Sequence, residues 1–110
     1  MDTDIISGTL DKWKNVSEER WDVVENFLIK DCGFELKGGK GSHFRFSHPL
    51  LREINYLFPS YLGQKFSRTS SLIVVQHKKR VTRSYLMLIV KIVEAIIEYK
   101  ELKKHKKIQN

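Results

Sequence analysis

A glycine-rich stretch holds the residues of this chain that are best suited to chemistry. Lys40 is followed by Gly41, Ser42 and His43. Glycine lets a phosphate or a backbone come close, lysine supplies positive charge, and an imidazole can move a proton near neutral pH. Arg45 comes two residues after His43, so both side chains point to the same face of a β-strand. The spacing therefore predicts an imidazole and a guanidinium side by side on the solvent face of a strand.

A second basic cluster follows an apolar segment near residue 75. The four consecutive residues are His77, Lys78, Lys79 and Arg80. We expect them to form a basic turn after a strand and to contact phosphate groups in a salt-dependent manner. His77 is a candidate proton donor, although nothing in the sequence places it near His43.

Other kinds of site have little support. The four histidines are scattered, and Cys32 is the only cysteine, so we expect no metal site and no cofactor. The spacing of a phosphate-binding P-loop is absent, and so is support for a serine-histidine-acid triad. A lone histidine on a strand is more often an ordinary surface residue than a catalyst.

The pattern of apolar residues predicts an α+β fold. We expect a helix over residues 17–32 with Ser17 as its cap, strands over 34–36, 42–48 and 72–77, and a helix over 85–104 capped by Ser84. The compact solution has the order α-β-β-β-α, with both helices on one face of a three-stranded antiparallel sheet.

A single domain is expected to span residues 17–102. Residues 1–16 are expected to be an N-terminal tail, although Leu10 and Trp13 leave packing on the domain open. Residues 50–71 form an insertion between the second and third strands, with a short helix over 50–57 and a flexible connector over 67–71. Residues 103–110 are expected to be a frayed basic tail.

The charge favours a polyanionic partner. The net charge is +7, but residues 1–36 carry four Lys and Arg against nine Asp and Glu, whereas residues 37–110 carry sixteen against four. The most apolar stretch, 85–99, is interrupted by charges and is too short for a bilayer span, so no membrane is expected. A single cysteine and an acidic N-terminus favour a soluble cytoplasmic protein.

Two stretches of the chain resemble the HicA toxin family. The first is Gly33–Leu36 with Lys40–Pro49, in which Gly41-Ser42-His43 falls on the family's glycine-serine-histidine signature. The second is the strand, histidine and basic turn over 74–79, followed by the helix from Tyr85. Together they cover about residues 17–49 and 72–99, and the insertion over 50–71 departs from the family pattern.

The resemblance implies both a fold and an activity. HicA proteins are small bacterial toxins that resemble a double-stranded-RNA-binding domain, cleave mRNA without a metal, and are neutralised by a HicB-type antitoxin. The resemblance implies that cleavage depends on His43. On chemical grounds, Lys40 and Arg45 would neutralise the phosphate and the charge that develops on it. An imidazole could start in-line attack by the RNA 2′-hydroxyl.

Two other functions stay open. One is a non-catalytic RNA-binding module on the same fold. The other is a protein-interaction subunit, because the helix over 85–104 is apolar around more of its circumference than one sheet needs. The same surface leaves room for a homodimer.

Overall fold

The computed structural model describes residues 2–57 and 71–109, and it is an α+β fold with antiparallel sheets, as predicted. The elements, in chain order, are α1 (Thr3–Trp13), β1 (Glu18–Arg20), α2 (Trp21–Asn26), the π-helical segment η1 (Phe27–Asp31), β2 (Glu35–Lys40), β3 (His43–Ser47), α3 (Pro49–Leu57), β4 (Ser71–Val75), β5 (Arg80–Thr82) and α5 (Arg83–Gln109).

Two antiparallel sheets are present in the described ranges. The larger has the order β2-β3-β4, and the smaller pairs β1 with β5. In the larger sheet His43 lies opposite Lys40 on β2 and Val75 on β4, and Arg45 lies opposite Ile73. The β2–β3 register shifts between Leu36 and Gly38, as at a β-bulge.

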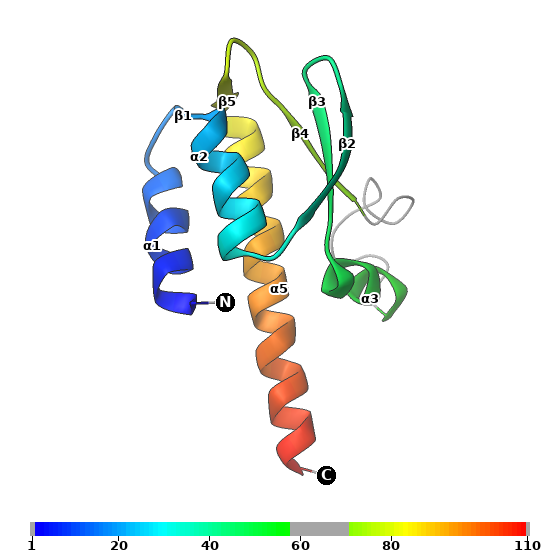
Figure 1. Ribbon diagram of the computed structural model, residues 1–110. Helices are drawn as coiled ribbons and strands as arrows, with labels where there is room; N and C mark the ends of the chain where they lie inside the picture. Colours follow the sequence, from blue (N-terminus) through cyan, green and yellow to red (C-terminus); the bar gives the residue numbers. More distant parts are fainter. Residues whose placement is uncertain (1, 58–70, 110) are drawn as a thin grey trace.

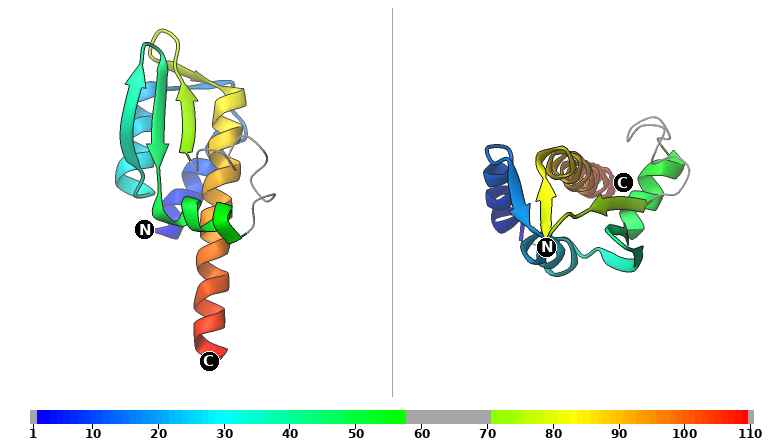
Figure 2. Two further views of the ribbon diagram at one scale, coloured as in Figure 1. Left: turned by 90° about the vertical axis from the view of Figure 1, so that its right-hand side faces the viewer. Right: turned by 90° about the horizontal axis from the view of Figure 1, so that it is seen from above.

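The elements form three layers (Figures 1 and 2). Helices α2 and α5 lie between the β2-β3-β4 sheet and α1. One hydrophobic cluster runs through these layers. Its largest fully buried side chains are Trp13, Phe46, Ile6, Leu28, Leu51, Ile54, Leu72, Leu86, Ile89, Ile92, Ile96 and Val24.

Aromatic packing fixes which face of β3 is covered. The Trp21 and Phe44 rings stack at 4.5 Å with an interplanar angle of 30°, and Trp21 also contacts Phe46 at 6.1 Å. Because side chains alternate along a strand, burying Phe44 and Phe46 directs His43 and Arg45 to the opposite, open face.

The N-terminal segment is a helix and not the expected tail. The Asp2 side chain caps α1 by accepting the N–H groups of residues 4 and 5. Ile6, Leu10 and Trp13 recur once per turn and are buried, and Trp13 packs edge-on against Phe27 at 4.9 Å. One apolar residue per turn is a weak signal in the sequence, so the packing of these side chains decides the structure.

The expected helix over 17–32 begins four residues late. Residues 18–20 form β1, which pairs with β5, and the helix starts at Trp21. Ser84 is likewise not a cap, since α5 begins at Arg83 directly after β5. Strands of three residues are too short to show an alternating pattern. The predicted α-β-β-β-α arrangement is therefore not confirmed, because α1, β1 and β5 are added to it.

Five further expectations have different outcomes. The short helix over 50–57 is confirmed by α3. The strand expected over 34–36 is longer, since β2 continues through Gly38 and Gly39 to Lys40, whereas the third strand ends at Val75 and not at His77. The basic end of the chain is helical as far as Gln109 and is not a frayed tail. Of the connector expected over 67–71, residues 67–70 lie outside the described residues, and Ser71 is instead the first residue of β4.

Helix α5 is the longest element and extends beyond the other layers (Figure 1). It begins in the core, where Leu86, Ile89 and Val93 are buried. Within 2–57 and 71–109, no helix is apolar over enough of its length to cross a membrane.

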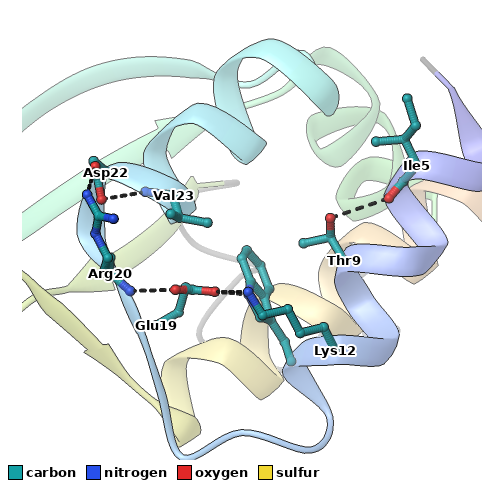
Figure 3. A network of polar contacts seen from close by, with 8 residues as sticks. Ile5, Thr9, Lys12, Glu19, Arg20, Asp22 and Val23 are labelled. Carbon is teal, nitrogen blue, oxygen red and sulfur yellow. Dashed lines mark hydrogen bonds and ion pairs between the residues drawn. The ribbon is translucent and has the colours of Figure 1, made fainter.

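A buried carboxylate joins α1 to β1 (Figure 3). Glu19, 8% exposed, accepts hydrogen bonds from the Arg20 backbone N–H at 2.9 Å and the Trp13 indole at 3.2 Å. The Lys12 ammonium lies 3.0 Å from Oε2, the same carboxylate oxygen that accepts the indole N–H. Burial acts to raise the pKa of Glu19, but these hydrogen bonds outweigh it and hold the pKa below the usual 4.5.

We predict that Glu19→Gln lowers the free energy of unfolding by about 1–3 kcal/mol at neutral pH, because a buried, charge-assisted network loses its charge. A lowered pKa stabilises the fold above the unfolded value of 4.5, and this stabilisation is lost as the pH falls through the folded pKa. Urea unfolding at about pH 7 and about pH 3.5 measures both effects.

The matched control is Glu101→Gln, which changes an exposed carboxylate on α5. It should leave the unfolding midpoint within about 0.5 kcal/mol of the wild type. An equal difference in the free energy of unfolding between wild type and Glu19→Gln at both pH values would contradict the role given to the carboxylate charge.

Candidate active site

The β2–β3 hairpin closes with a two-residue turn that presents the predicted catalytic residue. Gly41 and Ser42 form the turn, and Gly41 has a φ of +63°, which favours glycine. Lys40 and His43 pair directly across it. Directly paired residues have Cβ atoms about 5 Å apart on one face, so the turn places an ammonium beside the imidazole.

The open face of the sheet carries His43 and Arg45, as the sequence predicts. Both side chains are exposed, while Phe46 between the strands and the helices is fully buried. Ile73, opposite Arg45, is 38% exposed on the same face. A chain lying across this face would meet the imidazole, the guanidinium and an apolar side chain.

Ser42 can select the tautomer of His43. Its Oγ lies 3.4 Å from Nδ1 of the imidazole. If Nδ1–H donates to Oγ, the unprotonated Nε2 faces solvent and can accept a proton. Ser42 is therefore positioned to orient the histidine, and it need not take part in the reaction itself.

Gln76 joins the two basic clusters. Its backbone N–H donates to the Ser42 carbonyl at 2.9 Å, and its side-chain Oε1 accepts the Lys79 N–H at 2.8 Å. Figure 1 shows the β2–β3 turn and the β4–β5 turn at the same end of the molecule. The sequence analysis missed Gln76, because a single polar residue after a strand carries no motif.

The turn from His77 to Arg80 has an unusual backbone. The two end residues exchange backbone hydrogen bonds, and Lys78 and Lys79 between them have φ values of +51° and +63°. This is the type I′ geometry, for which Asn-Gly is preferred. A positive φ of this kind costs a residue with a Cβ roughly 1–2 kcal/mol, so two adjacent lysines in this turn are unfavourable for stability. Strain of this kind is often kept at functional sites.

Ion pairs divide the predicted binding cations into two groups. Arg80 pairs with Glu18 at 3.4 Å. Within the part of the chain that the structure describes, no ion pair is found for Lys40, Arg45, Lys78 and Lys79. These four exposed cations are the ones most available to a polyanion.

His77 has no demonstrated link to the catalytic candidate. Its side chain is exposed, and its backbone is bonded to Arg80. No hydrogen bond joins it to His43 among the described residues. Its role as a proton donor stays a prediction.

His48 has a structural place behind the site. Its Nδ1 accepts the Leu50 N–H at 3.1 Å, and its Nε2 donates to the Cys32 carbonyl at 3.1 Å. Burial lowers the pKa of His48 below the usual 6.5 despite the hydrogen bond to Cys32, so the neutral ring is favoured. The imidazole ties the end of β3 to the end of η1. Over residues 2–57 and 71–109 no three His, Cys, Asp or Glu side chains gather as metal ligands.

Comparison with known proteins adds no assignment: no protein-family model, curated protein or solved structure matches this chain. The geometry of the site is therefore the basis for its interpretation.

We predict that Gly39→Ala disturbs the hairpin. A Cβ at this position would lie 2.7 Å from Phe44 Cδ1 and 2.8 Å from the His43 carbonyl oxygen. The backbone oxygen cannot move aside cheaply, so we expect a loss of about 1–3 kcal/mol in the free energy of unfolding. Thermal unfolding measures it. Gly8→Ala is the control, since its Cβ would meet nothing within 4 Å, and equal stability of the two variants would contradict the close approach.

We predict the opposite sign for Lys79→Gly. Glycine adopts a positive φ without strain, so the free energy of unfolding should rise. The rise is up to about 1 kcal/mol, because the greater freedom of glycine in the unfolded chain offsets part of it. Urea unfolding of the variant against wild type tests this. Lys104→Gly, in the middle of helical backbone, should instead destabilise by about 1 kcal/mol. A lower midpoint for Lys79→Gly would show that the lysine turn carries no strain.

Proposed function

We propose that this protein is a metal-independent endoribonuclease of HicA-like toxin type, in which cleavage depends on His43. The observation that carries the proposal is the placement of an exposed imidazole beside Lys40 and Arg45 on the open face of a sheet. The two cations have no ion pair among the described residues and are available to a phosphate. Within the proposal the order α2–η1, β2, β3, β4, α5 is the HicA-like, double-stranded-RNA-binding-domain-like core.

The chemistry uses a group that RNA itself supplies. His43 Nε2 takes the proton of a 2′-hydroxyl, whose oxygen attacks the adjacent phosphorus. The P–O5′ bond breaks, and the leaving 5′ oxygen takes a proton from water or an acid. The products are a 2′,3′-cyclic phosphate and a 5′-hydroxyl end. Lys40 and Arg45 stabilise the charge that develops on the phosphate oxygens.

The proposed function includes a substrate, a protein partner and a cellular compartment. The substrate is mRNA in the cytoplasm, and a HicB-type antitoxin is the protein partner. The resemblance in sequence supports these points, together with the strongly basic half of the chain, which favours polyanions.

A non-catalytic RNA-binding module is the second candidate. It is favoured by the four cations that have no ion pair among the described residues, since they are sufficient for salt-dependent binding without a role for His43. Cleavage itself separates the two candidates.

We predict that the purified protein cleaves labelled single-stranded RNA in the presence of EDTA and that His43→Ala lowers the rate by roughly 10²–10⁴-fold. The variant should keep its fold, because the side chain is exposed, and most of its affinity for RNA. Gel analysis of the products measures the rate and shows whether a 2′,3′-cyclic phosphate is formed.

His77→Ala is the matched control, an exposed histidine at the same end of the molecule. A smaller loss of rate than in His43→Ala separates the base from any contribution of the second imidazole. Undiminished cleavage by His43→Ala would overturn the assignment of His43. Retention of RNA by the wild type without products would establish the binding module instead.

A further inference from the structure

A pocket lies beside the basic turn that runs from His77 to Arg80. Its volume is about 460 Å³, within the range of small-ligand sites. It is formed where β1 meets α2 and where the turn between β4 and β5 approaches them. The lining residues are Arg20, Trp21, Asp22, Lys78, Lys79 and Arg80.

The lining is strongly positive. Four cations face one carboxylate, Asp22, which pairs with Arg20 at 2.7 Å. Lys78 and Lys79 have no ion pair in the described part of the chain, so their charge is available to a ligand. Such a lining favours a phosphate over a neutral or cationic molecule.

The pocket is held in shape by backbone hydrogen bonds. The Trp21 N–H donates to the Lys79 carbonyl at 2.9 Å, and the Lys79 N–H donates to Gln76 Oε1 at 2.8 Å. The positive φ values of Lys78 and Lys79 set the direction in which the two side chains leave the turn.

The pocket is connected to the His43 turn by Gln76. This residue bonds to Ser42 on one side and to Lys79 on the other. An RNA strand whose scissile phosphate lies at His43 can therefore continue along the same end of the protein toward the pocket.

We propose that this pocket is an anchoring subsite that binds a backbone phosphate of single-stranded RNA at a nucleotide flanking the cleavage position. The inference rests on the proposed ribonuclease function and adds Arg20 and Trp21 to its binding surface. The subsite positions the substrate and takes no part in bond cleavage. Its loss should raise KM and leave kcat unchanged, and RNA too short to reach it should be insensitive to the loss.

The decisive variant replaces Lys78 by Asn and Lys79 by Gly together. It removes both charges and keeps a turn sequence that type I′ geometry prefers, so the fold is retained. The probe is a labelled single-stranded DNA of about 12 nucleotides, which spans both sites and lacks the 2′-hydroxyl needed for cleavage. We expect roughly 10-fold weaker binding than wild type and a salt dependence whose slope falls by about 1.4, or about 0.7 for each lost phosphate contact.

Two further variants sharpen the test. Lys30→Ala with Lys104→Ala removes the same charge from exposed positions at the other end of α2–η1 and on distal α5, and it should bind as wild type does. Asp22→Asn removes the one carboxylate of the lining, so its binding should be roughly 3-fold tighter.

The outcomes separate the subsite from the nuclease. Unchanged binding by the Lys78/Lys79 variant, or an equal loss in the Lys30/Lys104 variant, overturns the subsite, because charge would then act diffusely. Weaker binding by Asp22→Asn also overturns it. If wild type fails to cleave RNA while the Lys78/Lys79 variant alone loses binding, the ribonuclease proposal fails and the phosphate pocket stands.

Discussion

The contacts of Trp21 join the start of α2 to both the β2-β3-β4 sheet and the basic turn. Its ring stacks on Phe44 at 4.5 Å, which covers the inner face of β3, and its backbone N–H bonds to the Lys79 carbonyl at 2.9 Å. The first contact turns His43 outward, since side chains alternate along a strand. The second holds the basic turn against the start of α2. One residue therefore sets the position of the imidazole and of the cationic pocket.

The acidic beginning of the chain has a specific electrostatic effect. Glu18 and Asp22 pair with Arg80 and Arg20, respectively, and Glu19 is buried in the network that holds α1. The acidic segment thus neutralises the arginines of the pocket and leaves its lysines without ion pairs in the described chain. Exposed pairs of this kind contribute little to stability, so their main effect is on the local electrostatic potential.

The parts of the fold that could be predicted are those with strong local signals. The alternation around Phe44 and Phe46 identified β3 and its open face, and the long apolar run identified α5. Helix α1 could not be predicted with the same ease, because Ile6 and Leu10 gain their burial only from packing on other elements. The short strands β1 and β5 stabilise each other across sixty residues, and no local pattern reveals such a pair.

The candidate site shows the same division between local and long-range information. The residues from Lys40 to Arg45 could be identified from their types and spacing, and so could the lysines of the second turn. Their proximity could not, because it depends on Gln76 and on the positive φ of two lysines. Asn-Gly would satisfy this turn at lower cost, so local stability does not account for the lysines. The proposed phosphate subsite would account for them, since it needs positive charge at this turn.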